Sequence, residues 1–295
     1  MKIFITGATG RLGKHVLQKL DNAIPLVRKP AKLENEIVTD FSVGQLKTIL
    51  EDADVIVHLA GSIDFDNPKR LGEGNIGLTW RIAYSAPAKA RIVFASSVTV
   101  YGKKLKKIPA NEETPLAPDS EYSKTKKEAE DIIKKAKNHV ILRIGNIYGP
   151  EFRDYIRVLN LIKNKKMFIL GKGENHLPFI HVEDVADAIV AATKKGDGIY
   201  VLSGECKTQK EVYETAAKLM DIEPPKTRIP VTIAKILLKV IGGRTFKEEH
   251  VNILTADRIF DCSKAEKELG FKPRQLKNGI AEVIESMNKP QNQNQ

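Results

Sequence analysis

Three polar side chains have the types and spacing of a proton-transfer set: Ser97, Tyr122 and Lys126. Tyr122 and Lys126 lie four residues apart and therefore share one face of a helix. Ser97 follows a short apolar run that has the pattern of a strand. A free phenol has a pKa of ~10 and is a poor base at neutral pH. Because a nearby cation favours the phenolate, we expect Lys126 to lower the pKa of Tyr122 and make it a general base.

A glycine-rich turn near the start of the chain stands between an apolar run and a helical pattern. In such a unit the first glycine permits a tight turn, the second lets the backbone approach a pyrophosphate, and the third allows close helix-on-strand packing. The free N–H groups of the helix N-terminus bind phosphate. The turn therefore predicts a dinucleotide site, with an ordinary glycine-rich turn as the alternative. The contacts expected here are Gly7, Thr9, Gly10, Arg11, Leu12 and Gly13.

The residues after the second predicted strand bear on the type of dinucleotide. Many NAD enzymes carry an acid there that holds the ribose hydroxyls, whereas this chain has Arg28 and Lys29. A guanidinium suits the 2′-phosphate of NADP, so we prefer NADP over NAD. Solvated loop charges are the alternative interpretation. The further cofactor contacts that we predict are Asp40, Phe41, Leu59, Ala60, Gly61, Tyr122, Lys126 and Ile144.

A nicotinamide beside the three polar side chains would supply hydride chemistry, and the positive ring of its oxidised form would favour the phenolate of Tyr122 together with Lys126. The hydroxyl of Ser97 would hydrogen-bond the substrate oxygen, and Tyr122 would move its proton. The set therefore predicts reversible oxidation or reduction at a secondary alcohol or ketone.

Short β-branched apolar runs alternate with helical patterns over the first two hundred residues, which is typical of a parallel sheet flanked by helices. The predicted strands are Lys2–Thr6, Ile24–Val27, Glu36–Thr39, Val55–Leu59, Arg91–Ala95, His139–Arg143 and Gly198–Leu202. The predicted helices are Arg11–Leu20, Val43–Glu51, Asn75–Ala86 and Tyr122–Lys137. We expect an α/β fold: a doubly wound parallel sheet (Rossmann) with a smaller C-terminal substrate lobe. Residues 1–150, joined by a strand and helix near 179–203, would bind the dinucleotide, 151–287 would form the substrate lobe, and 288–295 would be a disordered tail.

The composition is typical of a soluble protein and carries a surplus of basic residues. The 295 residues include 48 Lys and Arg against 37 Asp and Glu, a formal net charge of +11. These basic residues are spread out, so we expect no nucleic-acid partner and attribute the surplus to an anionic cofactor or substrate. Cys206 and Cys262 are far apart and predict neither a disulfide framework nor a metal site. Without a long apolar run or a secretory signal pattern, we expect no membrane association and a cytoplasmic location.

Taken together, these motifs resemble the extended short-chain dehydrogenase/reductase family, also called the NAD-dependent epimerase/dehydratase family. The similarity runs over nearly the whole chain. Beyond the glycine turn and the Ser97 and Tyr122 segments, it includes His58–Gly61, Asn75–Thr79, Leu142–Pro150, Phe179–Ala186, Asp261–Lys264 and Leu269–Pro273. The resemblance implies a nucleotide-sugar substrate contacted by Ser97 and Asn146. It also implies a homodimer built on the helices at Asn75–Ala86 and Tyr122–Lys137.

Two departures from the family pattern concern the substrate. Sugar-nucleotide dehydratases of the family carry an Asp-Glu pair where this chain has Val98 and Thr99, so dehydration is disfavoured. An Arg-Asp pair that often contacts the diphosphate is replaced by Leu177 and Pro178, a loss for which Arg153 or Arg157 could substitute.

Two other functions stay open. Arg28 also resembles the corresponding residue of family reductases that act on steroid-like or flavonoid-like ketones, which makes an NADPH-dependent ketone reductase the first alternative. A non-catalytic dinucleotide-binding regulatory or assembly subunit is the second. His58 and His181 lie in apolar stretches, and we interpret both as structural histidines.

Overall fold

A seven-stranded parallel sheet forms the centre of the chain in the computed structural model, which describes residues 1–234, 236, 251 and 254–288. Its strand order is β11-β6-β5-β4-β1-β2-β3. The strands are β1 (Ile3–Thr6), β2 (Ile24–Val27), β3 (Ile37–Val38), β4 (Val55–His58), β5 (Arg91–Ser97), β6 (His139–Ile144) and β11 (Gly198–Leu202). Every strand that the sequence predicted for this sheet is present, and the doubly wound parallel fold is confirmed.

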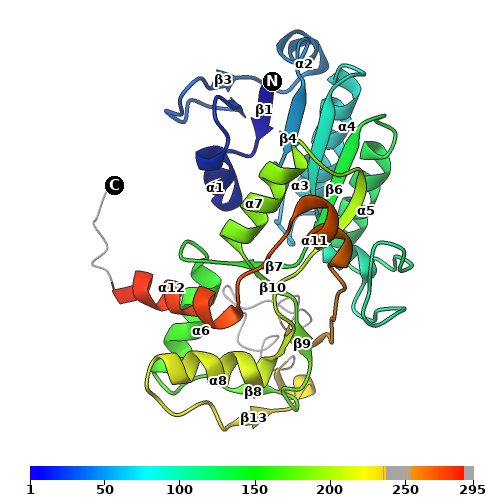
Figure 1. The fold of residues 1–295 in the computed structure, drawn as a ribbon. Coiled ribbons are helices and arrows are strands. Elements are labelled where there is room, and N and C mark those ends of the chain that lie inside the picture. Colours follow the sequence, from blue (N-terminus) through cyan, green and yellow to red (C-terminus); the bar gives the residue numbers. More distant parts are fainter. Residues whose placement is uncertain (235, 237–250, 252–253, 289–295) are drawn as a thin grey trace.

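Helices cover both faces of the sheet (Figure 1). Side chains alternate between the faces, so Ile3 and Ile5 pack with one helical layer while Phe4 packs with the other. The first layer holds α1 (Arg11–Lys19), α7 (Val182–Ala192) and α11 (Ser263–Leu269). The second holds α2 (Val43–Ile49), α4 (Leu78–Ser85) and α5 (Glu121–Ile133). Because both faces are buried, the strands read as nearly continuous apolar runs.

The two helices nearest the predicted catalytic residues differ in their bounds from the prediction. The segment predicted as one helix from Asn75 begins with the π-helical turn η1 (Gly72–Gly77) after the short α3 (Pro68–Leu71), and α4 follows it. Helix α5 begins one residue earlier than predicted, because Ser120 caps it through the amide of Ser123, and it ends at Ile133, four residues early.

A small lobe lies below the sheet lobe and has a hydrophobic core of its own, which includes Leu159, Leu177 and Ile280 (Figure 1). Its helices are α6 (Arg153–Lys163), α8 (Gln209–Leu219) and α12 (Leu276–Asn288). Its strands pair as β7 (Asn146–Tyr148) with β10 (Phe179–His181), β9 (His176–Leu177) with β12 (Lys207–Thr208), and β8 (Ile169–Leu170) with β13 (Arg228–Ile229). The predicted domain limits at 150 and 287 stay a prediction, and residues 289–295 of the predicted tail lie outside the described residues.

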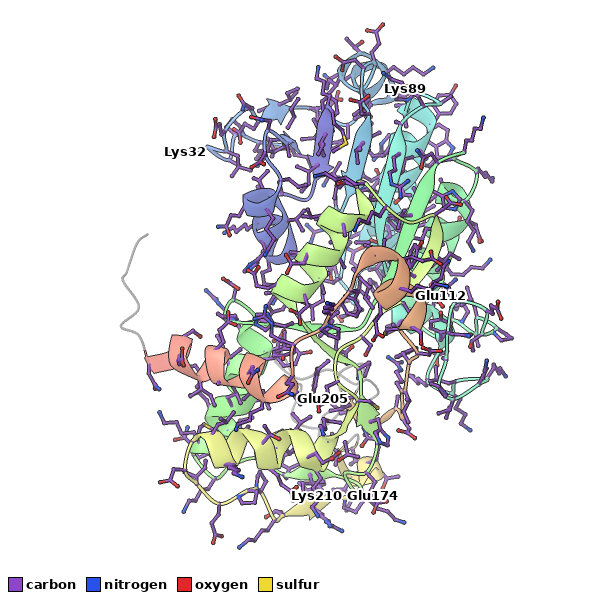
Figure 2. The ribbon with its side chains drawn as sticks, viewed as in Figure 1. Lys32, Lys89, Glu112, Glu174, Glu205 and Lys210 are labelled. Carbon is purple, nitrogen blue, oxygen red and sulfur yellow. The ribbon has the colours of Figure 1, made fainter. Side chains whose placement is uncertain are left out.

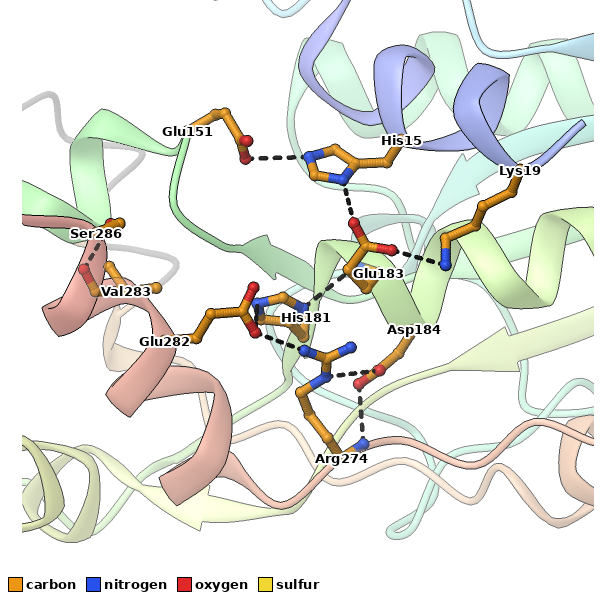
Figure 3. Close-up of polar contacts among 10 residues, drawn as sticks. All are labelled: His15, Lys19, Glu151, His181, Glu183, Asp184, Arg274, Glu282, Val283 and Ser286. Carbon is orange, nitrogen blue, oxygen red and sulfur yellow. Dashed lines mark hydrogen bonds and ion pairs between the residues drawn. The ribbon is translucent and has the colours of Figure 1, made fainter. Parts of the chain in front are cut away.

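A polar network joins helices α1 and α7 to the start of the small lobe (Figure 3). On α1, His15 contacts Glu183 of α7 and lies 3.0 Å from the carboxylate of Glu151. On the other side of α7, Arg274 donates to Asp184 at 2.9 Å and to a carboxylate of α12 at 2.7 Å. The network thus connects α1 to the segment that leads into α12.

Charged side chains project from both lobes, with Lys32 and Lys89 on the sheet lobe and Lys210 on the small lobe (Figure 2). In the described residues no helix has the length and apolar character needed to cross a bilayer. The cytoplasmic location stays a prediction.

Candidate active site

Ser97 and Tyr122 lie together at the carboxyl edge of the sheet. Ser97 is the last residue of β5, and Tyr122 stands in the first turn of α5. Their side chains are close enough for hydrogen bonding with Ser97 to lower the pKa of Tyr122. Thr99 donates both its amide, at 3.2 Å, and its hydroxyl, at 3.1 Å, to the Ser97 oxygen. The Ser97 oxygen is thereby held in place beside the phenol.

Lys126 is buried one helical turn beyond Tyr122, with 6% of its surface exposed. Its ammonium donates to the carbonyl oxygen of Ala95 at 2.5 Å and lies 4.4 Å from the ring centroid of Phe94. Burial lowers the pKa of Lys126 to about 8, while the charge of Glu130 acts in the opposite direction. A cation with this pKa is still mostly protonated at neutral pH.

The predicted lowering of the Tyr122 pKa is wrong for the chain on its own. Burial raises the pKa of Tyr122 to about 12, and the hydrogen bond with Ser97 only partly opposes this shift. Lys126 directs its ammonium to the Ala95 carbonyl instead. The cost of removing a phenolate from water outweighs what these neighbours supply. Tyr122 is therefore a protonated phenol at neutral pH.

The position of α5 follows from contacts that the motif itself does not contain. The buried side chain of Asn75 donates to the hydroxyl of Thr125 at 3.0 Å and accepts the amide of Ser62 at 2.8 Å. The ring of Phe65 meets that of Tyr122 edge to face, with centroids 5.5 Å apart. The loop after β4 is thus fastened to the helix that carries Tyr122 and Lys126.

The glycine turn has the geometry that a pyrophosphate requires. Gly7 has a φ of +76°, which favours glycine, and a Cβ at Gly13 would lie 2.0 Å from the Gly7 carbonyl oxygen. Helix α1 begins after Gly10 with no side-chain cap. The N–H groups of its first turn therefore remain available to a phosphate, and the residues present fit a dinucleotide.

A cavity of about 1010 Å³ extends from this turn along the ends of β2 and β4. Arg28 stands in its wall with the guanidinium carbon 5.8 Å from the ring centroid of Phe41. Seven of the predicted cofactor contacts line it: Gly7, Thr9, Arg28, Lys29, Phe41, Ala60 and Gly61. The structure brings these together from four separate segments of the chain.

Other predicted cofactor contacts lie elsewhere. Arg11 stacks over the ring of Phe152 at 4.6 Å, and the exposed Asp40 accepts the amide of Ser42 at 2.7 Å. Leu12, Leu59 and Ile144 pack in or against the core beneath the sheet edge. Their roles in cofactor binding stay predictions.

The sequence analysis did not predict that the segment between β4 and α4, which contains α3 and η1, forms a wall of the cavity. It contributes Ser62, Ile63, Asp64, Asn67, Lys69, Arg70, Glu73 and Gly74. The signal was present, because this stretch follows the fourth strand and is polar and glycine-rich. Arg70 pairs with Asp64 at 3.1 Å within the loop, which limits its freedom to contact a ligand.

The two further residues predicted to contact substrate differ in their surroundings. The side-chain amide nitrogen of Asn146 is buried and has no hydrogen-bond partner among the described residues. A buried donor of this kind is suited to a ligand oxygen. Arg153 is the exposed first residue of α6. Both stay predicted substrate contacts.

The two histidines have structural roles. His58 is fully buried and hydrogen-bonds Thr6 at 2.7 Å and Thr79 at 2.9 Å through its two ring nitrogens. Burial lowers its pKa to about 3, so the ring is neutral. His181 caps α7 by accepting the amide of Glu183 at 3.3 Å.

Comparison with known proteins finds relatives along nearly the whole chain. The chain is 28% identical to the "Putative UDP-glucose 4-epimerase" of Methanocaldococcus jannaschii, covering 97% of this chain and 98% of the relative. It is 29% identical to the "3beta-hydroxysteroid-dehydrogenase/decarboxylase isoform 2" of Arabidopsis thaliana over 82% of this chain, and spans only 50% of that relative's length.

Solved structures have the same fold. A UDP-glucose 4-epimerase from Thermotoga maritima with UDP-glucose matches with a TM-score of 0.77 at 21% identity, covering 97% of this chain and 98% of that one. A UDP-glucuronic acid 4-epimerase from Bacillus cereus in complex with NAD matches with a TM-score of 0.74 at 21% identity, covering 98% and 100%.

The model of the NAD dependent epimerase/dehydratase family matches residues 3–203, which include the glycine turn, the cavity and the predicted catalytic residues. The chain therefore belongs to the NAD dependent epimerase/dehydratase family, a family of nicotinamide-dependent enzymes.

Proposed function

We propose that the chain is a nucleotide-sugar epimerase that oxidises a secondary alcohol of its substrate and reduces the resulting ketone again. The observation that carries this proposal is the pairing of Ser97 with Tyr122 at a strand end, above the buried cation of Lys126. The names of the Methanocaldococcus relative and of the Thermotoga structure support a UDP-sugar as substrate.

Each side chain has one task in this reaction. Ser97 hydrogen-bonds the substrate oxygen, and Tyr122 gives or takes its proton. Lys126 places a positive charge beside the reacting groups and favours the phenolate whenever Tyr122 has given up its proton. A bound nicotinamide would supply the acceptor and donor of hydride. Val98 and Thr99, which follow Ser97, are not acids, so the proposal excludes dehydration.

We infer that NADP is the preferred dinucleotide. Arg28 and Lys29 lie in the wall of the cavity directly after β2, where a 2′-phosphate would need cations. Lys69 adds a third positive charge to the same wall. The Bacillus cereus neighbour was solved with NAD, so a direct comparison of the two cofactors is needed.

A ketone reductase is the second candidate. Arg28 in the cavity and the similarity to the Arabidopsis 3β-hydroxysteroid dehydrogenase/decarboxylase favour it. The two functions differ in the fate of the cofactor, because a reductase consumes one equivalent of NADPH per turnover and an epimerase consumes none.

The test is incubation of the purified chain with UDP-glucose and either NADP or NAD. Epimerisation is expected to produce the sugar epimer, seen by anion-exchange chromatography, with no net change in absorbance at about 340 nm, where a nicotinamide that changes redox state changes its absorbance. Loss of NADPH absorbance with a ketone substrate would instead establish the reductase. If the chain binds neither cofactor, or binds one and turns over no substrate of either class, the proposed enzyme is refuted.

We also propose that the chain forms a homodimer through α4. Trp80 and Tyr84 are 48% and 56% exposed on this helix, and their rings stack 5.0 Å apart. Apolar surface exposed in one place on a protein is favourable to bury against a partner. Light scattering is expected to give twice the chain mass for the wild type, and the chain mass for Trp80→Ser/Tyr84→Ser. Val38→Ser, at an exposed apolar residue of β3, is the control. A monomeric wild type would refute the dimer.

A further inference from the structure

A second buried charge stands on the same face of α5 as the proposed catalytic residues. Tyr122, Lys126 and Glu130 follow one another at intervals of four residues. Glu130 is fully buried, with 0% of its surface exposed. No step of the proposed reaction uses this carboxylate, and burying a charge is costly unless it is paired.

Glu130 is paired with groups from both neighbouring strands. One oxygen accepts the hydroxyl of Ser96 at 2.6 Å, next to the catalytic Ser97 on β5. The other accepts a guanidinium nitrogen of Arg143, from β6, at 2.8 Å. The nearby Lys134 ammonium is 3.8 Å away.

Arg143 extends the same network to the far side of Ser97. Its guanidinium donates to the hydroxyl of Tyr101 at 2.8 Å, and that hydroxyl donates to the carbonyl of Asn111 at 2.7 Å. Ser96 before the catalytic serine and Tyr101 after it are therefore both tied to one buried ion pair. These contacts join α5 to β5 and β6 next to Ser97.

We propose that Glu130 is a positioning residue of the active site, whose buried carboxylate locks α5 to the end of β5 and supplies the negative charge that faces Lys126. This inference rests on the proposed function, because it assigns Lys126 its part in binding and catalysis. The charge of Glu130 raises the pKa of Lys126 against the effect of burial. Around the ammonium lie the Ala95 carbonyl and the Phe94 ring of β5, and His58 of β4, which is neutral because its pKa is about 3.

The test measures NADPH binding by nicotinamide fluorescence from about pH 6 to about pH 10, a range that brackets the Lys126 pKa. Wild-type affinity is expected to fall as Lys126 loses its proton, through a midpoint near the pKa of about 8. In Glu130→Gln the midpoint is expected to fall by roughly one pH unit, because a charge that favours the ammonium is gone. Glu128→Gln, an exposed acid of the same helix, is the matched control and should keep the wild-type midpoint. Lys126→Met should show no fall in NADPH affinity near this pH.

A double variant guards against failure to fold, since Glu130→Gln leaves the Arg143 cation unpaired. Glu130→Gln/Arg143→Gln removes both charges, and its midpoint is expected to lie between those of Glu130→Gln and the wild type, because the repulsion from the Arg143 cation is lost as well. If folded variants, checked by circular dichroism, melt at lower temperature but keep the wild-type midpoint, Glu130 is only structural and the inference is overturned. Failure of the wild type to bind NADPH or NADH would refute the proposed function itself, a result distinct from normal binding with an unshifted midpoint.

Discussion

The surroundings of Tyr122 decide whether its phenol is ready to donate a proton or to accept one. Burial raises its pKa to about 12, and the only opposing influence is the hydrogen bond with Ser97. The phenol therefore holds its proton at neutral pH and is ready to donate it to a ketone oxygen. Proton abstraction from an alcohol requires a further positive charge close to the ring, beyond what Lys126 supplies on its own.

The first prediction concerns this hydroxyl. Tyr122→Phe is expected to lower turnover by about 10²- to 10⁴-fold, the usual contribution of one general acid–base group, while NADPH affinity and melting temperature change little. The phenylalanine keeps the ring contact with Phe65. Product formation, fluorescence titration and circular dichroism measure the three quantities. Turnover near the wild-type rate would exclude Tyr122 from proton transfer.

The second prediction concerns the cation after β2. Arg28→Asp is expected to raise the Kd for NADPH by roughly 10- to 100-fold, because a charge-assisted contact to the 2′-phosphate is lost and replaced by repulsion. The Kd for NADH should change far less, since NADH has no such phosphate. Lys89→Ala, far from the cavity on the sheet lobe, is the charge control (Figure 2). An equal rise in the Kd values for NADPH and NADH would show that Arg28 does not contact the 2′-phosphate.

The sequence predicted where Ser97 and Tyr122 lie better than it predicted the protonation state of Tyr122. A strand-end Ser97 and a helix-start Tyr122 meet because the carboxyl ends of parallel strands share one edge of the sheet. The partner of Lys126 could not be predicted, because the Ala95 carbonyl lies 31 residues away in sequence and carries no side-chain signal. The Glu130–Arg143 pair is hidden for the same reason: only packing shows that a helix acid and a strand base share one buried space.

Helix α1 and its turn depend on close approach between backbone segments. The third prediction is that Gly13→Ala destabilises the fold by about 3 kcal/mol and abolishes dinucleotide binding, because its Cβ would lie 2.0 Å from the Gly7 carbonyl oxygen. Gly44→Ala in α2 is the matched control, since its Cβ would meet nothing within 4 Å. It should stabilise the chain by about 0.5–1 kcal/mol through the helix propensity of alanine. Urea unfolding measures the free energy of unfolding of both variants. A Gly13→Ala variant with wild-type stability would contradict the close contact between Gly13 and the Gly7 carbonyl.

Elements were predictable where burial on both sides gives a strong pattern. The seven strands of the sheet were found for that reason, because β-branched apolar runs between turns have few other interpretations. The π-helical turn before α4 was not found, since its cause is tertiary: Asn75 turns its side chain to Ser62 and Thr125. The small strands β8 to β10 and β12 to β13 are two or three residues long and leave too short a pattern to read in full.

At the scale of the whole molecule, a polar network joins α1, α7 and the segment that leads into α12 (Figure 3). Burial lowers the pKa of His181 to about 4, and the charge of Arg274 adds to the effect. The pKa of Glu183 is also lowered, because hydrogen bonds from Lys19 and His15 outweigh its burial. Both groups prefer their deprotonated forms in the folded chain.

The fourth prediction follows from these directions. The unfolded chain binds protons more readily at His181 and Glu183, so stability is fully present above about pH 6.5 and is lost as the pH falls toward about 4. The melting temperature of the wild type should decline over this interval. The melting temperature of His181→Phe, which keeps an aromatic ring, should decline less steeply. His139→Gln, on β6, is the control. Identical slopes for wild type and His181→Phe would show that other groups cause the acid sensitivity.

Helix α1 takes part in two contacts at once. Its N-terminus carries the free amides of the glycine turn, while Arg11 and His15 on its flank touch Phe152 and Glu151 at the threshold of the small lobe. Helix α1 therefore connects the glycine turn directly to the start of the small lobe. If the two regions are coupled through α1, any gain in affinity that the dinucleotide gives to a ligand of the small lobe must equal the gain that this ligand gives to the dinucleotide.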